Sequence, residues 1–286
     1  MRKRRFRLGS LLRRFRRALA IEKGRPYYYL GKGHAMIELH DGSPFLVGTE
    51  NLDISTSLIR RGRWEEWIEP HIIGSVDSGS VFVDAGANMG YFSVLVGRVV
   101  EPRGRVYAYE PNPFLYGFLK KNFFINGISG EACPYALGRE RRDATLWVRT
   151  IDSGGGYLSD DPHSDYTDSG HTGIPVKVEA LDDILAKDIE VDSMKIDVEG
   201  REPQVVAGAE QVIKRSRRLK MFIELNPQAW AGQGYDPKAF FGSLASMGFE
   251  FRILLPDGVQ LCGAAQLIEL AGKLPYTTHF MAGRPG

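Results

Sequence analysis

From residue 81 onward, short apolar segments alternate with longer segments of helical periodicity. The expected strands are Val81–Ala85, Arg105–Glu110, Cys133–Leu137, Ser193–Val198, Lys220–Leu225 and Phe249–Leu254. The expected helices are Tyr91–Val100, Phe114–Asn126, Pro203–Arg215 and Pro237–Met247. Strands separated by helices of this length imply βαβ crossovers, so the pattern predicts an α/β fold with a mostly parallel sheet and helices on both faces. A last apolar run, Thr278–Ala282, predicts an added edge strand.

The segments outside this alternation divide the chain further. Residues 1–24 form a basic arm, residues 25–80 a lead-in, and residues 81–286 the main α/β domain. In the lead-in, GHAMIEL and SPFLVG predict a hairpin, and ISTSLIRRGRWEEWIEPHII predicts a helical stretch interrupted around Gly62. Within the main domain, ATLWV and PVKVEAL predict two strands that flank a Gly-, Ser- and Asp-rich insertion at 152–173. A structureless loop of this length is typical of a lid or binding loop, and the alternative is a plain surface insertion.

The charge of the chain is unevenly distributed. Residues 1–20 contain nine Lys or Arg and no acid, and removing these nine from the 37 basic residues leaves 28 against 35 acidic residues. A mildly acidic body argues against a nucleic-acid-binding protein. In the arm, apolar residues recur at helical spacing among the arginines of residues 2–19, which is typical of a helix that lies on an anionic membrane surface. A basic leader, RNA contact and targeting are the alternatives.

The cellular compartment is suggested by what the sequence lacks. The two cysteines, Cys133 and Cys262, lie far apart without metal-ligand spacing, which fits a reducing compartment. No segment approaches the roughly 20 apolar residues of a membrane span, and no signal-peptide core follows the basic start. We therefore expect a cytoplasmic protein, with peripheral membrane contact through the arm as an additional hypothesis.

The segment VFVDAGANMG carries the most informative pattern. A buried strand ends in Asp84, and the turn of Gly86, Ala87, Asn88 and Gly90 leads directly into an apolar helix. Glycines allow a sharp turn and close approach to a ligand at the helix N-terminus. The spacing D-x-G-x-N-x-G differs from the G-x-G-x-x-G of dinucleotide-binding proteins. Asp84 suits the positively charged amino acid end of S-adenosylmethionine, whereas it would repel a pyrophosphate.

The next two strand ends complete the expected nucleoside site. Glu110 ends the second strand 24 residues after Gly86, where an acid can accept hydrogen bonds from both ribose hydroxyls. Asn112 follows it, and Ala136 with Leu137 at the next strand end would flank the adenine. The alternatives are a solvated loop acid for Glu110 and plain core positions for Ala136 and Leu137.

A second polar group of residues lies in SMKIDVEG. Lys195 and Asp197 share one face of a strand because side chains alternate, and Glu199 follows. Buried charges at a strand end are costly unless they are paired or used in chemistry. The interpretations are therefore an active site or an internal Lys195–Asp197 ion pair.

Together these motifs resemble a known family. DAGANMGYFS, YAYEPNP, NFFING, ALG, LDDIL, MKIDVEGREPQVVAGA and FIELNP occur in this order, as in the FkbM-type methyltransferases. The resemblance runs from about residue 50 to the C-terminus. It implies a Rossmann-like class I methyltransferase fold with a seven-stranded sheet, and methyl transfer to a hydroxyl of a sugar, glycolipid or polyketide-type natural product. It also implies that Asp84, Gly86, Asn88, Gly90 and Glu110 contact the cofactor and that Asp197 lies in the active site. The basic arm and the 152–173 insertion depart from the family pattern.

Methylation of a hydroxyl calls for a general base or a metal ion that acidifies the hydroxyl. Asp197 is the first candidate base, with Lys195 orienting it, and His163 and His171 of the insertion are alternatives. In the metal alternative, a Mg²⁺ or Mn²⁺ ion would be held by Asp197, Glu224 and Asn226, because some O-methyltransferases of this fold hold a divalent ion with acids after the fourth and fifth strands. Methylation of nitrogen, a nicotinamide-dependent oxidoreductase and a non-catalytic Rossmann-type binding protein are the competing functions. The oligomeric state is left open.

Overall fold

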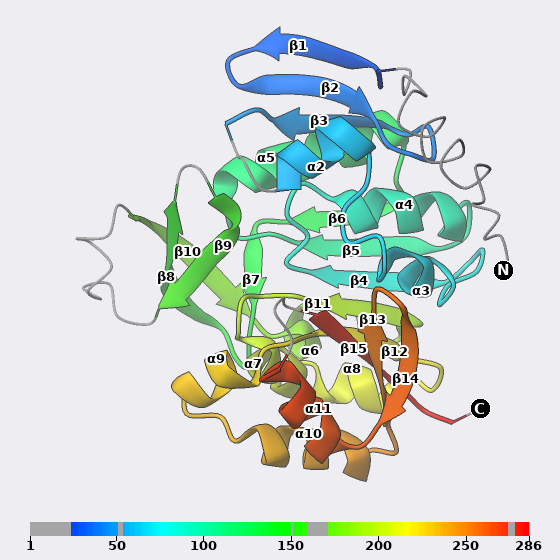
Figure 1. Cartoon of the computed structure of the whole chain (residues 1–286), viewed down its shortest axis with the longest axis vertical. Coiled ribbons are helices and arrows are strands. Elements are labelled where there is room, and N and C mark those ends of the chain that lie inside the picture. The colour runs from blue at the N-terminus through cyan, green and yellow to red at the C-terminus, as the bar shows by residue number, and fades with distance from the viewer. Residues whose placement is uncertain (1–23, 51–53, 150–151, 160–170, 274–277, 286) are drawn as a thin grey trace, which may run out of the picture.

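A computed structural model describes residues 24–50, 54–149, 152–159, 171–273 and 278–285 (Figure 1). The expected basic arm at residues 1–24 and its membrane-binding segment at 2–19 therefore fall almost wholly outside the described residues. Within the described part of the chain, no helix is long and apolar enough to cross a membrane.

The central element is an eight-stranded sheet in the order β14-β13-β15-β12-β11-β4-β5-β6. Its strands are β4 (Val81–Ala85), β5 (Arg105–Tyr109), β6 (Gly130–Cys133), β11 (Ser193–Ile196), β12 (Lys220–Leu225), β13 (Glu250–Leu255), β14 (Gly258–Cys262) and β15 (Thr278–Gly283). The strands from β12 through β11, β4 and β5 to β6 are parallel, and β15 runs antiparallel to both β12 and β13. The expected α/β fold with a mostly parallel sheet is confirmed.

Two details of this sheet differ from the sequence-based expectation. The sheet has eight strands instead of seven, because β14 folds back on β13 as an antiparallel neighbour. The strand at 278–283 was expected at an edge, but it lies inside the sheet between β12 and β13. Its apolar residues Phe280 and Ala282 are fully buried, which agrees with an internal strand whose face is covered by helices.

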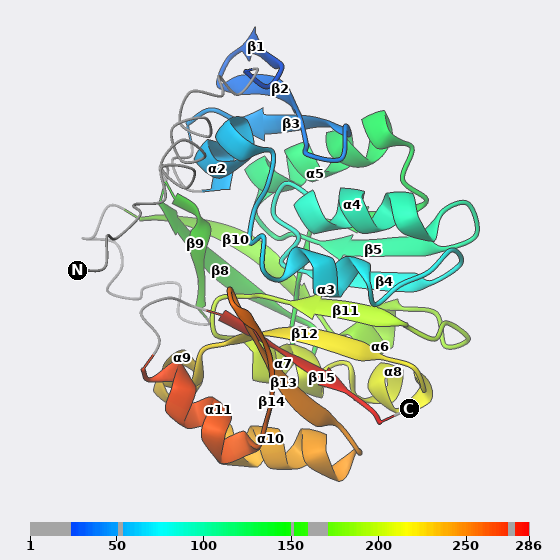
Figure 2. The same ribbon diagram turned by 45° about the vertical axis from the view of Figure 1, so that its right-hand side comes forward.

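Helices cover both faces of the sheet (Figures 1 and 2). The helices are α2 (Ile54–Arg61), α3 (Glu69–Ile73), α4 (Tyr91–Val100), α5 (Pro113–Asn126), α6 (Leu181–Ile184), α7 (Glu202–Ala207), α8 (Glu210–Arg215), α9 (Pro227–Gly232), α10 (Pro237–Ser246) and α11 (Ala264–Ala271). Helices α2 to α5 share one apolar core with Phe82 of β4, and α6 to α11 share the other core with Val83 of the same strand. Adjacent residues of one strand thus serve opposite layers, as strand alternation requires.

The helix expected at 203–215 is two helices, α7 and α8, separated at Gly208. A Cβ at position 208 would lie 1.9 Å from the carbonyl oxygen of Gly138. The end of α7 therefore packs directly on the backbone of Gly138, and that close approach requires glycine.

A three-stranded antiparallel sheet of β1 (Tyr27–Gly31), β2 (His34–Glu38) and β3 (Pro44–Gly48) lies next to α5. The predicted hairpin is β2–β3, and β1 adds a strand that the sequence pattern did not reveal. Asn122 of α5 is fully buried and forms hydrogen bonds with the backbone N–H and carbonyl of Leu46 at 2.7 and 3.0 Å. Its amide also donates to the carbonyl oxygen of Met89 at 2.8 Å. One side chain therefore ties the lead-in sheet to the turn that follows β4.

A third sheet has the order β7-β10-β8-β9, with β7 at Tyr135–Leu137, β8 at Arg142–Arg149, β9 at Asp152–Ser159 and β10 at Thr172–Glu179. The single strand expected at 133–137 is wrong, because the chain leaves the main sheet after Cys133 and enters this sheet at Tyr135. The insertion at 152–173 also differs from a structureless loop, because residues 152–159 form β9. His163, a candidate base, lies outside the described residues.

Candidate functional site

The turn between β4 and α4, residues 86–90, has a backbone that requires its glycines. Gly86 and Gly90 have φ angles of 78° and 91°, in the left-handed region that favours glycine. A Cβ at position 86 would lie 1.9 Å from the backbone oxygen of Asp197. Asn88 also has a positive φ of 52°, which asparagine tolerates better than most residues. The turn therefore lies against the end of β11, which brings the two informative sequence motifs together.

Glu110 closes this turn from the neighbouring strand. Its side chain is only 6% exposed, and its two carboxylate oxygens accept hydrogen bonds from the backbone N–H groups of Asn88 at 2.9 Å and Asn112 at 2.8 Å. Burial raises the pKa of Glu110 to about 7, although the two backbone hydrogen bonds oppose the rise. Each carboxylate oxygen has a second lone pair, so Glu110 can accept two further hydrogen bonds from a ligand in the adjacent cavity.

A cavity of about 350 Å³ opens beside this turn, at the carboxyl ends of β4 and β11. Its lining includes the expected cofactor residues Gly86, Ala87, Asn88, Glu110, Asn112, Ala136 and Leu137. The last two come from β7 of the third sheet, not from the main sheet as expected. The cavity thus lies where ligands bind in open parallel sheets.

Asp84 lies beneath this cavity and is not among its lining residues. It is 1% exposed, and its Oδ2 accepts a hydrogen bond from the Ser93 hydroxyl at 2.6 Å. Burial raises the pKa of Asp84, and the nearby Lys195 opposes this rise. The structure therefore places Asp84 as a buried residue that contacts α4 through Ser93, outside the cavity lining where the sequence led us to expect it.

Lys195 and Asp197 form the predicted pair at the floor of the cavity. Lys195 is 3% exposed, and its Nζ lies 2.8 Å from Asp197 Oδ2 and 5.4 Å from the centre of the Phe92 ring. Burial opposes ionisation of both groups and is the largest single influence on each, but the neighbouring charges together outweigh it. Asp197, Asp84 and Glu65 raise the pKa of Lys195, and Lys195 with His279 lowers the pKa of Asp197. Asp197 is therefore held as a carboxylate in contact with the cavity.

The register of the sheet explains why charged groups collect here. Lys195 pairs with Asp84 on β4, and Glu224 of β12 pairs with His279 of β15. Paired residues lie on the same face of a sheet, and Asp197 lies two residues after Lys195, level with Glu224. Four adjacent strands thus present polar side chains to the face that α4 covers.

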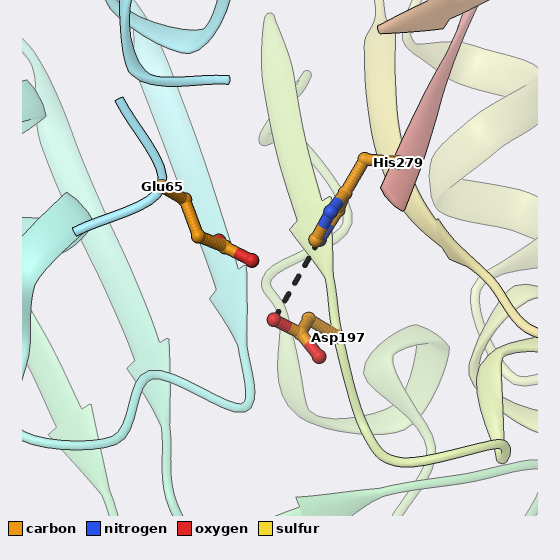
Figure 3. A group of neighbouring side chains, drawn as sticks. All are labelled: Glu65, Asp197 and His279. Carbon is orange, nitrogen blue, oxygen red and sulfur yellow. Dashed lines mark ion pairs between the residues drawn. The ribbon is translucent and has the colours of Figure 1, made fainter. Parts of the chain in front are cut away.

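Two members of this group were not predicted from the sequence. One potential ligand atom each of Glu65, Asp197 and His279 lies within 4.8 Å of the others (Figure 3). Glu65 belongs to the segment between α2 and α3 and has a positive φ of 46°, which no sequence pattern indicated. His279 did leave a signal, since it is a polar residue near the start of an apolar strand, but the strand pairing that brings it next to Glu224 is not local.

Of the other predicted residues Glu224, Asn226 and His171, only Glu224 is among the residues that line the cavity. Glu224 lines the cavity, and burial together with Asp197 raises its pKa well above the ordinary value. The side-chain oxygen of Asn226 instead accepts a hydrogen bond from the backbone N–H of Ala229 at 3.1 Å and caps α9. His171 precedes β10 and is not among the residues that line the cavity. The expected Asp197–Glu224–Asn226 metal ligands are therefore not assembled as a set.

Comparison with known proteins assigns the family. The model of the methyltransferase FkbM domain matches residues 84–251, which is more than half of the 286 residues. A protein described as methyltransferase sdnD from Sordaria araneosa is 24% identical over 193 residues, covering 58% of this chain and 72% of the relative.

Two solved structures are among those similar to this chain. A methyltransferase FkbM from Methylobacillus flagellatus KT is 17% identical, with a TM-score of 0.44 over 72% of this chain and 44% of that chain. TYW2 of M. jannaschii in complex with AdoMet is 12% identical, with a TM-score of 0.43 over 90% of this chain and 89% of that chain. It is the family match, together with the glycine turn, Glu110 and the strand order, that identifies the protein: the chain belongs to the FkbM methyltransferase domain family and is a methyltransferase that uses S-adenosylmethionine.

Proposed function

We propose that this protein transfers the methyl group to a hydroxyl oxygen of a sugar, glycolipid or natural-product acceptor. The observation that carries the proposal is the Asp197 carboxylate, which is held in its charged form by Lys195 at the floor of the cavity. A charged carboxylate in contact with a cavity can accept the proton of an acceptor hydroxyl.

Different residues around the cavity bind the cofactor and orient the acceptor. Glu110 and the turn at 86–90 suit the ribose and the amino acid end of S-adenosylmethionine, which supplies a methyl group on a sulfonium sulfur. Asp197 accepts a hydrogen bond from the acceptor hydroxyl and so orients its oxygen, and alignment supplies much of the rate of such a displacement. Because Lys195 lowers the pKa of Asp197, the proton moves to Asp197 only as the new O–C bond forms and the hydroxyl becomes strongly acidic.

The walls of the cavity favour an acceptor with apolar surface. Trp64, Phe92, Leu146 and Leu158 line it, from the α2–α3 segment, α4 and the third sheet. Aromatic and aliphatic side chains pack against the C–H faces of sugar rings and against polyketide or lipid chains. A small-molecule or glycan acceptor fits this lining better than a nucleic acid, whose phosphates would meet an acidic floor.

A Mg²⁺ or Mn²⁺ ion is a further expectation from the sequence. Asp197 and Glu224 line the cavity, but Asn226 caps α9, so two of the three predicted ligands face an ion at this position and water or the acceptor would complete its coordination.

The proposal is tested with labelled S-adenosylmethionine and extracts of cell glycans, lipids and metabolites, followed by mass spectrometry of the product. We expect a methyl ether, and we expect Asp197→Asn to lose at least about 100-fold in turnover while binding S-adenosylhomocysteine like the unmodified protein. Asp183→Asn, an exposed acid on α6, is the matched control and should change neither property. A label on nitrogen, or full turnover by Asp197→Asn, would refute hydroxyl methylation by this site.

A further inference from the structure

Three side chains from distant parts of the chain converge beside the cavity, and we call them the Glu65–Asp197–His279 cluster. Glu65 comes from the segment between α2 and α3, Asp197 follows β11, and His279 belongs to β15 (Figure 3). One potential ligand atom of each lies within 4.8 Å of the others, and His279 Nε2 lies 3.6 Å from Asp197 Oδ2. Glu65 and Asp197 also line the cavity, so the cluster faces the space where the acceptor is expected.

The cluster contains polar atoms that have no partner among the described residues. His279 is only 1% exposed, and neither of its ring nitrogens has a hydrogen-bond partner there. The same holds for buried Oε2 atoms of Glu65 and of the neighbouring Glu224. An unpaired buried polar atom destabilises the fold, so several of them around one point indicate a ligand that satisfies them.

The charges around the cluster determine the sign of that ligand. The carboxyl groups of Asp197, Asp84 and Glu65 interact electrostatically with the ammonium of Lys195. The carboxyl group of Glu224 interacts in turn with those of Asp197 and Glu65. Four carboxyl groups share one ammonium in a region removed from water, so they cannot all be ionised there without further positive charge. Buried charges of this kind are stabilised by pairing or by metal coordination, so the ligand is a cation.

We propose that Glu65, Asp197 and His279 bind a divalent transition-metal ion, represented by Mn²⁺. Imidazole nitrogen together with two carboxylates favours Mn²⁺, Fe²⁺ or Zn²⁺ over Mg²⁺, which prefers oxygen ligands and water. Metal–ligand distances of about 2.0–2.2 Å place neighbouring ligand atoms roughly 3–4 Å apart. The observed separations therefore need only small side-chain movements. A carboxylate has about four lone-pair positions, so Asp197 can keep its contact with Lys195 while it binds the ion.

This ligand set differs from the one predicted from the sequence. Asp197 is common to both, but Glu65 and His279 replace Glu224 and Asn226. In the reaction, a role that rests on the proposed function, the ion would bind the acceptor oxygen and lower the pKa of its hydroxyl, so that a weakly basic carboxylate suffices to take the proton.

Metal binding is tested without any turnover assay, which separates this proposal from the proposed function. Mn²⁺ is titrated into the full chain, and bound and free ion are distinguished by electron paramagnetic resonance. We expect one tightly bound Mn²⁺ per chain, and an at least tenfold lower affinity in both Glu65→Gln and His279→Gln. In the unmodified protein, spin-echo spectra should show nitrogen coupling from a coordinated imidazole, and His279→Gln should abolish this coupling.

The matched control is His40→Gln. His40 also contacts a carboxylate, with Nε2 at 3.0 Å from Glu69 Oε1, but it lies outside the cavity lining, so its loss should leave Mn²⁺ affinity unchanged. Circular dichroism of each variant separates lost binding from lost folding. If Glu65→Gln does not fold, the conservative variant Glu65→Asp takes its place in the titration. Because Asp retains a carboxylate, we expect Glu65→Asp to keep part of the Mn²⁺ affinity. The proposal would be overturned if the full chain bound no Mn²⁺ below about 1 mM, or if the folded Glu65→Gln and His279→Gln variants bound Mn²⁺ as tightly as the unmodified protein. Complete displacement of Mn²⁺ by S-adenosylhomocysteine would also overturn it, and would assign the cluster to the cofactor's amino group.

Discussion

The protonation of Glu110 should control how strongly this protein binds the ribose of its cofactor. Burial raises the pKa of Glu110 to about 7, and an ionised carboxylate is the form that accepts hydrogen bonds at all of its lone pairs. If only that form binds, the apparent dissociation constant is the intrinsic value divided by the ionised fraction. With a pKa of about 7, this fraction is roughly 0.1 at pH 6 and 0.9 at pH 8, so the affinity should rise about tenfold between them.

The measurement is isothermal titration calorimetry with 5′-methylthioadenosine, which has the ribose but no titrating amino group. Glu110→Gln should bind about 10–100-fold more weakly at pH 8, since a hydrogen bond to a charged group contributes about 1.5–3 kcal/mol, and its affinity should not change with pH. Glu131→Gln, an exposed acid on β6, should retain the pH dependence. An affinity for the unmodified protein that is equal at pH 6 and pH 8 would refute the assignment of ribose recognition to an acid with a raised pKa.

The same pKa shift affects the stability of the ligand-free protein. Because the folded-state pKa of Glu110 is about 7 against an ordinary value of 4.5, the folded protein binds more protons than the unfolded chain between these pH values. The free energy of unfolding should therefore fall as pH rises through this window, by about 3 kcal/mol from this residue. Urea denaturation at pH 5 and pH 8 should show a smaller fall in Glu110→Gln, and an identical fall would contradict the shift.

Three further substitutions test the supports of the site by urea denaturation. Gly86→Ala should cost at least about 2 kcal/mol, because its Cβ would lie 1.9 Å from the backbone oxygen of Asp197 and φ is positive; a change under about 0.5 kcal/mol would contradict the close contact. Asn122→Ala should lower the free energy of unfolding by about 3 kcal/mol and weaken 5′-methylthioadenosine binding, because three buried hydrogen bonds join the lead-in sheet to the turn. Unchanged binding would show that the conformation of the turn does not depend on Asn122. Glu202→Gln should cost about 2 kcal/mol and change the fluorescence of Trp230, whose ring N–H donates to Glu202 at 2.6 Å; an unchanged spectrum would refute that contact.

Local patterns predicted the elements of the parallel half of the sheet well. β4, α4 and β12 have the predicted bounds, because an apolar run with helical or strand periodicity is a property of neighbouring residues. The turn after β4 was recognised for the same reason, since its glycines and its acid lie within a few residues. The strand at 278–283 was predicted in the right place along the chain but in the wrong place in the sheet, since strand order depends on distant partners.

The sequence predicted those residues of the site whose positions depend on their neighbours along the chain. Glu110 and the Lys195–Asp197 pair follow from strand ends and alternation. Glu65 reaches the same point from a segment without periodicity, and His279 arrives from an antiparallel strand, so neither could be placed without knowledge of the sheet order. Asn226 has a second role that its position after a strand also allows, because its side chain caps the following helix.

The internal position of β15 also sets the order in which the molecule can be completed during synthesis. β12 and β13 each pair with β15 on the side where they would otherwise present unpaired backbone groups, and β15 comes after both of them in the chain. The nucleoside half, from β4 to β6, involves shorter sequence separations and can assemble while later residues are still being added. Until residues 278–283 leave the ribosome, the nascent chain has two open strand edges and lacks His279. A ribosome-bound chain that ends before residue 278 should therefore bind chaperones and aggregate more readily than one that includes β15.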